Sequence, residues 1–249
     1  MKSLLFITFL CLNFSSLSCA NDNLPGVSKF IDEMHDEHGF DKTELQTIFG
    51  QVNVKKSILK AIARPAEKSK PWYDYRKIFI TQKRINNGGA FWQANKSALV
   101  KAEKEFGVPA EIIIAILGVE TSYGNNVGGY RVVDALSTLA FRYPPRSKFF
   151  RSELGHFLFL TREEKMSILS PMGSYAGAMG LGQFMPSSFR AYAVDFDGDG
   201  KRDIWTNPTD AIGSIANYLN RHGWVAGESI AHKTTVAGSP PVALLEKGT

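Results

Sequence analysis

The sequence predicts a mainly α-helical protein with a metal-binding loop. Apolar residues recur at the spacing of a helix face through most of the chain, whereas the alternating pattern of a half-buried strand is nearly absent. Residues 195–210 break the helical pattern with closely spaced aspartates and glycines. With 249 residues, 44% of them apolar and 21% charged, the chain can bury a substantial core, which argues against a disordered or membrane-spanning class.

Residues 1–20 have the order of a secretory leader. Lys2 is followed by a short apolar run and then by small residues up to Ala20. Cleavage after Ala20 would release a soluble protein, whereas acylation of Cys19 would leave a lipid anchor rather than a membrane span. Both alternatives stay open, and either one takes the protein out of the cytoplasm.

The cysteines and the charge narrow the choice of chemistry and partner. Cys11 and Cys19 both lie in the leader region, so the mature chain has neither a disulfide nor thiol chemistry. The net charge is +5, with basic residues concentrated in the first half. A solvated basic face and attraction to an anionic wall polymer or membrane surface both fit this charge. Export and the lack of a recognisable binding module argue against nucleic acid as a partner.

Residues 21–105 are expected to form an N-terminal helical subdomain. Apolar residues between Val27 and Met34 share one helix face, and Asp41 with Glu44 forms a capping box for the next helix. A further helix is expected from Phe91 to Phe106.

An aromatic cluster follows the helix breaker Pro71. It consists of Trp72, Tyr73 and Tyr75. Such side chains pack into a core or line a sugar-binding cleft, and the pattern leaves both alternatives open.

The core of the chain is expected within residues 106–224. Helical periodicity predicts helices over residues 132–143, 147–160 and 209–222, the last one stopped by Gly223. Residues 225–249 show no clear periodicity and are expected to form a shortened C-terminal tail of loop.

A very apolar segment in this region ends in a single carboxyl group. Pro109 can open a helix, and apolar residues from Ile112 to Val119 cover every face, so we expect the helix to be buried all round. Glu120 lies in its last turn, where desolvation and the negative end of the helix dipole would raise its pKa. A carboxyl that stays protonated near neutral pH can serve as the general acid in glycosidic bond cleavage. An ordinary exposed glutamate remains the alternative.

Residues 173–186 form a segment rich in glycine and alanine, which allows close approach of a neighbouring backbone or ligand. It lacks the Gly-Lys-Ser/Thr ending of a phosphate loop and does not predict nucleotide binding. Ser174 and Gln183 are suited to hydrogen-bonding a carboxylate, a hydroxyl or an acetamido group. Tight packing between helices is the alternative.

Residues 195–206 match the calcium loop of an EF-hand, with acidic residues at its first, third, fifth and ninth positions and glycine at the sixth. These residues are Asp195, Asp197, Asp199, Asp203 and Gly200. Lys201 at the seventh position would contribute a backbone oxygen. Thr206 replaces the usual glutamate at the twelfth position, which makes Asp210 the nearest candidate for the last ligand. Carboxylates this close would repel one another without a cation, so we expect a structural calcium ion.

Through the segments 118–124 and 173–188, the sequence resembles the membrane-bound lytic murein transglycosylase B family. The resemblance runs from about Trp72 to Trp224 and includes the calcium-loop pattern and residues 210–218. It implies a lysozyme-like helical catalytic core, residues 106–224, with a calcium loop at residues 195–210. It also implies action on the β-1,4 bond between N-acetylmuramic acid and N-acetylglucosamine in peptidoglycan.

The resemblance further implies roles for individual residues. Glu120 matches the family's single catalytic acid/base, which would protonate the glycosidic oxygen and then help the muramic C6 hydroxyl attack C1, leaving a 1,6-anhydro end. Ser174 matches the residue that orients this glutamate, and Gln183, Tyr75 and Tyr218 match positions in the sugar cleft. The matching metal ligands are Asp195, Asp197, Asp199, Lys201 through its main chain, and Asp210.

Two other functions stay open. A peptidoglycan hydrolase (muramidase) would need a second carboxylate, for which Asp134 and Glu153 are candidates without a spacing argument. A non-catalytic peptidoglycan-binding protein is the other, because the family continues well beyond Trp224 with a Tyr-rich segment, whereas this sequence stops at Thr249. We expect a monomer that binds glycan strands in the periplasm, anchored to the outer membrane if Cys19 carries lipid.

Overall fold

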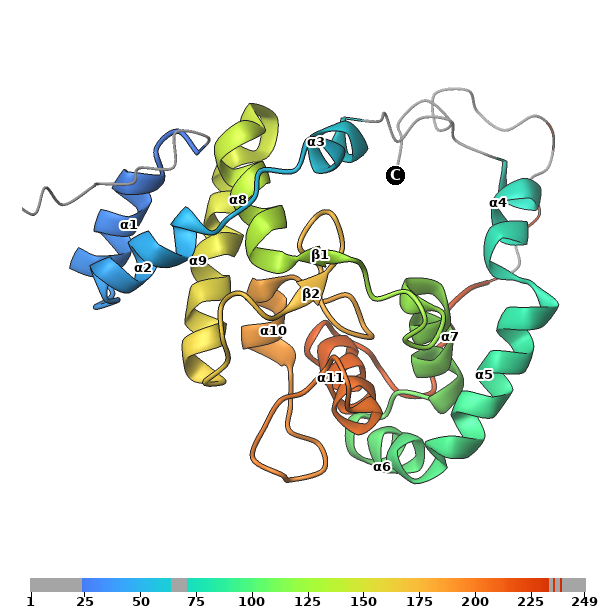
Figure 1. Cartoon of the computed structure of the whole chain (residues 1–249). Helices are drawn as coiled ribbons and strands as arrows, with labels where there is room; N and C mark the ends of the chain where they lie inside the picture. The colour runs from blue at the N-terminus through green and yellow to red at the C-terminus, as the bar shows by residue number, and fades with distance from the viewer. Residues whose placement is uncertain (1–23, 64–70, 233–234, 236–237, 239–249) are drawn as a thin grey trace, which may run out of the picture.

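The computed structural model describes residues 24–63 and 71–232, together with residues 235 and 238. The expected leader lies outside the described residues, as does most of the expected tail. The described part is mainly helical, as predicted (Figure 1). None of its helices combines the length and apolarity needed to span a bilayer.

The described part contains the following helices in chain order. They are α1 (Val27–Asp36), α2 (Lys42–Gly50), α3 (Lys56–Ile62), α4 (Trp72–Phe79), α5 (Gln82–Ala94), α6 (Lys96–Phe106), α7 (Ala110–Thr121), α8 (Val132–Arg142), the 3-10 turn η1 (Pro144–Arg146), α9 (Ser147–Glu163), α10 (Pro186–Tyr192) and α11 (Pro208–Arg221). Strands β1 (Tyr130–Arg131) and β2 (Met172–Gly173) pair antiparallel, with Tyr130 opposite Gly173.

Most of the predicted helices lie where the periodicity placed them, and one prediction is wrong in its extent. Asp41 caps α2, because its Oδ1 accepts the backbone N–H of Glu44 at 2.6 Å. The single helix expected from Phe91 to Phe106 is instead two helices, α5 and α6, which meet at Asn95. The Asn95 side chain donates to the Phe91 carbonyl at 2.9 Å, the local bonding by which asparagine competes with a continuous helix.

Helix α8 is the centre of the core. Its residues 132–140 are all buried, against α9 and against the smaller helices α1 to α3 (Figure 1). Three of these residues are polar, namely Asp134, Ser137 and Thr138. Asp134 and Thr138 accept the backbone N–H groups of Asn53 and Lys55, so they tie the connection between α2 and α3 to the core.

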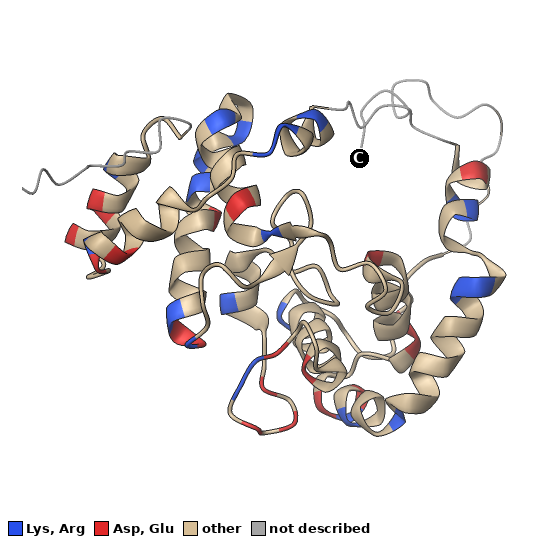
Figure 2. Cartoon of the chain, viewed as in Figure 1, with Lys and Arg blue, Asp and Glu red and all other residues tan. Residues whose placement is uncertain are grey.

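The other helices form a curved outer part. α6 packs on α11 and on α7, and α5 lies against α7 (Figure 1). Figure 2 shows the described basic residues of the first half spread over the helices from α1 to α6.

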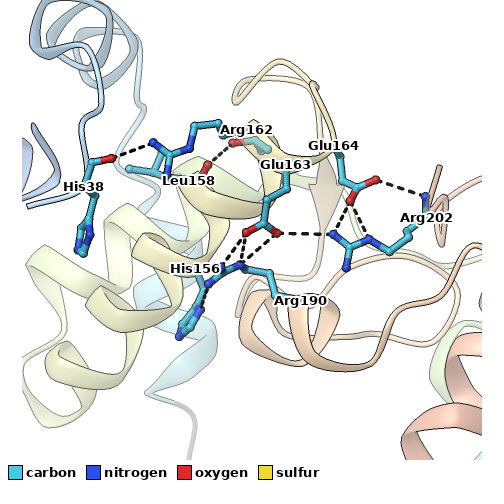
Figure 3. Close-up of polar contacts among 9 residues, drawn as sticks. His38, His156, Leu158, Arg162, Glu163, Glu164, Arg190 and Arg202 are labelled. Atoms are coloured by element: carbon cyan, nitrogen blue, oxygen red, sulfur yellow. Dashed lines mark hydrogen bonds and ion pairs between the residues drawn. The ribbon is translucent and has the colours of Figure 1, made fainter. Parts of the chain in front are cut away.

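A network of charged side chains fastens the aspartate-rich loop to the end of α9 (Figure 3). Arg202 donates to Glu164 Oε1 through Nε at 2.7 Å and through Nη2 at 2.5 Å. Arg190 of α10 donates to Glu163 at 2.7 Å and to Nδ1 of His156 at 2.9 Å. The loop and α10 are therefore held by the same turn of α9.

We expect Asp134→Ala to lower the free energy of unfolding by about 3 kcal/mol, because it removes the buried partner of Arg131 and leaves polar groups unpaired. Arg131 binds Asp134 at 2.8 Å and the Asp134 side chain is 3% exposed. Asp74→Ala is the matched control, because Asp74 pairs with Lys77 at the same i,i+3 spacing but on an exposed surface. Urea unfolding curves compare the two variants, and equal losses would contradict the prediction.

Candidate active site

A pocket of about 380 Å³ opens beside the end of α7. It is lined by Ile116 and Glu120 of α7, by residues 182–185 of the Gly- and Ala-rich segment, by Ser188 of α10 and by one face of α11. Glu120 is the only residue with a carboxyl group among these lining residues. The pocket therefore brings together segments that are far apart in the sequence around one acidic side chain.

Helix α7 is not buried all round, so that expectation is wrong. Ile113 and Leu117 are fully buried, but Val119 is 47% exposed and Glu120 is also exposed. α7 packs against α5, α6 and α11 and is open on its remaining side. An apolar sequence does not reveal which of its faces will lack a partner.

The surroundings of Glu120 favour its protonated form. More than a third of its surface is accessible, yet partial burial raises its pKa above the ordinary value of 4.5 by making the charged form less favourable. No described residue donates a hydrogen bond to its carboxyl group or forms an ion pair with it. Such a group can release a proton into the pocket and accept one later.

Thr121 connects the end of α7 to the Gly- and Ala-rich segment. Its hydroxyl donates to the carbonyl of Leu181 at 2.9 Å and accepts the N–H of Gly124 at 3.0 Å. The side chain is buried. This bond sets the distance between Glu120 and the neighbouring Gln183, and its role was missed at the sequence level. The one available signal was a hydroxyl directly after the glutamate at the end of an apolar helix.

The segment that carries Gln183 is held by close backbone contacts. A side chain at Gly180 would put its Cβ 2.5 Å from the Ile204 carbonyl, which confirms that this segment needs small residues for close backbone approach. Gln183 has a left-handed backbone with φ of 52°. Its Nε2 donates to the carbonyl of Gly180 at 2.9 Å and of Val127 at 3.3 Å, which fixes the side chain at the edge of the pocket.

Two other predicted sugar-binding residues lie in different places. Tyr218 of α11 lines the pocket. Its ring stacks on that of His222, with centroids 4.0 Å apart, and lies edge-on to that of Phe184, with centroids 5.9 Å apart. Tyr75 lies on α4, away from the pocket lining, and is 47% exposed. Its neighbours Trp72 and Tyr73 are 69% and 61% exposed, so the aromatic cluster is not part of the core.

Ser174 supports the Gly- and Ala-rich turn. Its hydroxyl accepts the backbone N–H groups of Ala176 at 3.3 Å and Ala178 at 3.1 Å. Ser174 does not line the pocket, and within the described chain no hydrogen bond joins it to Glu120. The structure thus brings Gln183 and Tyr218 to Glu120, but neither Ser174 nor Tyr75.

Three aspartates of the predicted calcium loop converge. Oxygen atoms of Asp195, Asp197 and Asp210 lie within 4.8 Å of one another. Asp210 is fully buried and accepts the backbone N–H groups of Phe196 and Asp203 at 2.7 and 2.8 Å. Within the described chain, no lysine or arginine forms an ion pair with these three carboxyl groups. A hard cation fits this set of oxygen donors.

The other predicted ligands are turned differently. The Asp199 carboxyl accepts the N–H of Lys201 at 2.9 Å and is not one of the three converging groups. Asn207 donates to Asp197 Oδ2 at 2.8 Å, which closes the loop toward α11. The roles of Asp199 and of the Lys201 main chain as ligands stay predictions.

The mainly helical fold matches those of solved lysozyme-like lytic transglycosylases. Residues 23–248 match the family described as the transglycosylase SLT domain, and the chain belongs to this family. The resemblance to the membrane-bound lytic murein transglycosylase B family is confirmed.

Three relatives show the extent of the similarity. Membrane-bound lytic murein transglycosylase B of Escherichia coli (strain K12) is 46% identical over 218 residues, which are 84% of this chain and 60% of the relative. The crystal structure of soluble lytic transglycosylase SltB1 from Pseudomonas aeruginosa has a TM-score of 0.81 and 60% identity, covering 82% of this chain and 69% of that chain. The Escherichia coli lytic transglycosylase Slt35, in complex with calcium, has a TM-score of 0.79 and 47% identity, covering 83% and 66%. The chain thus spans about 60% of the length of its curated relative.

We expect Glu120→Gln to stabilise the protein at neutral pH. Because burial raises the pKa of Glu120 in the folded state, its contribution to stability is fully present below the unfolded value of 4.5 and is lost as pH rises through the folded pKa. The glutamine variant lacks this loss. Its free energy of unfolding relative to wild type should therefore be larger at about pH 7 than at about pH 4 in urea titrations.

Glu111→Gln serves as the control for this measurement. Glu111 is an exposed residue in the first turn of the same helix, where the helix dipole favours a negative charge. Replacement of Glu111 by glutamine should lower the stability at neutral pH, which is the opposite of the effect expected for Glu120→Gln. A Glu120→Gln variant that gains nothing between the two pH values would contradict the prediction.

Proposed function

We propose that the protein is a lytic transglycosylase that cleaves the β-1,4 bond between N-acetylmuramic acid and N-acetylglucosamine in peptidoglycan. The observation that carries the proposal is Glu120. It is the one carboxyl group among the described residues that line the pocket, and burial raises its pKa. Membership of the transglycosylase SLT domain family supports it.

In the proposed reaction, Glu120 works first as an acid and then as a base. Its proton goes to the glycosidic oxygen, so the bond from that oxygen to C1 of the muramic residue breaks and the N-acetylglucosamine end leaves as an alcohol. The resulting carboxylate then accepts the proton of the muramic C6 hydroxyl as that oxygen bonds to C1. The product is a 1,6-anhydro end, no water is consumed, and the proton returns to Glu120.

The positions of Glu153 and Asp134, the two candidates for a second carboxylate, argue against a hydrolase. Glu153 is buried, and its two oxygens accept the N–H of Ser187 at 2.9 Å and the Ser187 hydroxyl at 2.7 Å. Asp134 is paired with Arg131 in the core. Neither is available to activate a water molecule opposite Glu120, as a muramidase with two carboxyl groups requires.

Other side chains would hold the sugar. Gln183 and Tyr218 line the pocket with an amide and an aromatic ring, groups that suit an acetamido group and a sugar face. Ser174 would act on the site through the Gly- and Ala-rich turn that it supports. Tyr75 would contact the glycan strand farther from the cleaved bond.

Replacement of Glu120 by glutamine should lower the turnover of peptidoglycan by at least about 100-fold, because the amide cannot donate or accept the proton. Purified protein is incubated with peptidoglycan, and the masses of the released muropeptides are measured by mass spectrometry. Wild type should release anhydro products, each one water lighter than a hydrolysed product. Glu111→Gln should keep this activity.

Two outcomes would contradict the proposal. Hydrated products from wild type would indicate a hydrolase. A wild-type protein that binds peptidoglycan without cleaving it, with the same affinity in Glu120→Gln, would indicate a binding protein.

We also propose that Asp195, Asp197 and Asp210 hold a structural calcium ion, with Asp199 and the Lys201 main chain as further ligands. The convergence of three carboxyl groups and the calcium complex of Slt35 support this assignment. The ion would stabilise the loop that Arg202 fastens to α9, and would take no part in bond cleavage.

Removal of calcium with a chelator should lower the melting temperature, and added calcium should restore it. At a calcium concentration 100 times the Kd, binding contributes about 2.7 kcal/mol to the free energy of unfolding. Asp197→Asn should abolish the calcium response. Asp36→Asn, an exposed position at the end of α1, should keep it. A melting temperature that the chelator leaves unchanged would refute the assignment.

For location, we propose the periplasm, with the glycan strand as partner and the chain acting as a monomer. The name of the curated Escherichia coli relative describes it as membrane-bound. Cys19, the residue that would carry an outer-membrane lipid anchor, lies outside the described residues. The choice between a soluble and an anchored form therefore rests on the leader pattern alone.

A further inference from the structure

We infer that Tyr123 is a positioning residue that fixes α4 and α5 to helix α7 and thereby sets the grip on the glycan strand. Residues 72–94, which form α4 and α5, are named the arm. The inference rests on the proposed function, because it concerns how the same cleft holds its substrate. Tyr123 acts through the position of the arm and of Tyr75 on it.

The arm has almost no core of its own. α4 contains no buried residue, and the only buried residue of α5 is Gly88. Several apolar side chains of the arm are exposed, among them Ile78, Ile80 and Ile85. In Figure 1 the arm curves along the outer side of α7. Its position therefore depends on the contact of α5 with α7 around Gly88, together with the partly buried side chains of Phe91 and Trp92, which pack against the core.

The contact area around Gly88 is occupied by the phenol of Tyr123. A Cβ added at Gly88 would lie 2.5 Å from the Tyr123 hydroxyl oxygen, and one added at Gly118 of α7 would lie 2.6 Å from it. Both distances are shorter than real Cβ contacts. The Tyr123 ring also packs on Phe91 of α5, with centroids 5.6 Å apart. The phenol thus lies between the two helices, and a glycine on each makes room for it.

The backbone turns sharply to put the phenol there. Ser122 and Tyr123 have φ angles of 52° and 61°, in the left-handed region that residues other than glycine adopt at an energetic cost. The Tyr123 N–H donates to the carbonyl of Leu117 at 3.1 Å, which closes the end of α7. This strained turn starts two residues after Glu120, so the proton donor and the arm contact share one structural element.

Arg84 of α5 is bonded within the arm, where its Nη1 donates to the carbonyl of Ile78 at 3.0 Å, and it acts on Tyr123 through its charge. Arg84 lies one turn before Gly88, and its positive charge acts to lower the pKa of Tyr123, while burial, the larger effect, raises that pKa. Nε of Arg84 is buried and has no hydrogen-bond partner among the described residues. The contact between the arm and α7 is therefore a specific junction of a phenol, two glycines and the Phe91 ring.

Displacement of the arm should change substrate binding more than chemistry. A methyl group at Gly88 has to move from 2.5 Å to at least 3.4 Å from the Tyr123 oxygen to reach ordinary contact. That movement shifts Tyr75 with the arm, whereas Glu120 stays on α7. Loss of binding that is equal in ground state and transition state raises KM and leaves kcat nearly unchanged.

The first test is steady-state kinetics on soluble glycan strands without stem peptides. Gly88→Ala should raise KM about tenfold and change kcat by less than about twofold. Gly89→Ala is the matched control, since nothing lies within 4 Å of a Cβ there, and it should keep the wild-type KM. The double variant Gly88→Ala/Tyr123→Phe, which removes the clashing oxygen and keeps the ring on Phe91, should return KM to within about threefold of wild type.

The second test does not depend on turnover. Hydrogen exchange of residues 72–94 should be faster in Gly88→Ala than in Gly89→Ala and should return toward wild type in the double variant. If wild type fails to cleave glycan strands, the proposed function fails and the exchange data still decide the role of Tyr123. Equal KM and exchange in Gly88→Ala and Gly89→Ala would overturn the inference, and so would a double variant that restores neither.

Discussion

The hydrogen bond from the Thr121 hydroxyl to the Leu181 carbonyl is the interaction on which the rest of the site depends. Helix α7 is open on one side at its end, so packing alone does not define where Glu120 lies. The bond links two segments 60 residues apart and joins the glutamate to the turn that carries Gln183. A buried hydrogen bond contributes only about 1 kcal/mol net, but leaving the carbonyl unpaired costs roughly 1–3 kcal/mol. The two halves of the pocket are therefore kept in register by one buried hydroxyl.

Much of the fold could be predicted because its helices bury regular apolar faces. The helices found as α1, α8, α9 and α11 follow directly from the periodicity, and the cap of α2 follows from Asp41. The placement of Glu120 at a helix end could also be predicted, since it needs only the length of one apolar segment. Asp195 and Asp197 could be predicted because alternate residues of the EF-hand loop pattern point toward one centre, whereas the Asp199 carboxyl accepts the N–H of Lys201 instead.

The rest depends on contacts that no local pattern encodes. Helix α7 is apolar on every face and yet is open on one side. Helix α8 buries polar residues, because Asp134 and Thr138 accept backbone N–H groups from a distant connection. The end of α5 at Asn95 is decided by one side-chain hydrogen bond. The exposure of Trp72 results from the arm having too few neighbours, which residue type cannot show.

Among the described residues, the lining of the pocket beside α7 contains no histidine, lysine or arginine, and its one carboxyl group is that of Glu120. Near neutral pH its lining is therefore either uncharged or singly negative, and it cannot become positive. A cationic ligand gains attraction only when the glutamate has lost its proton, and an anionic ligand finds no counter-charge in either state. The charge preference of this pocket thus depends on a single carboxyl group and changes in one step with acidity.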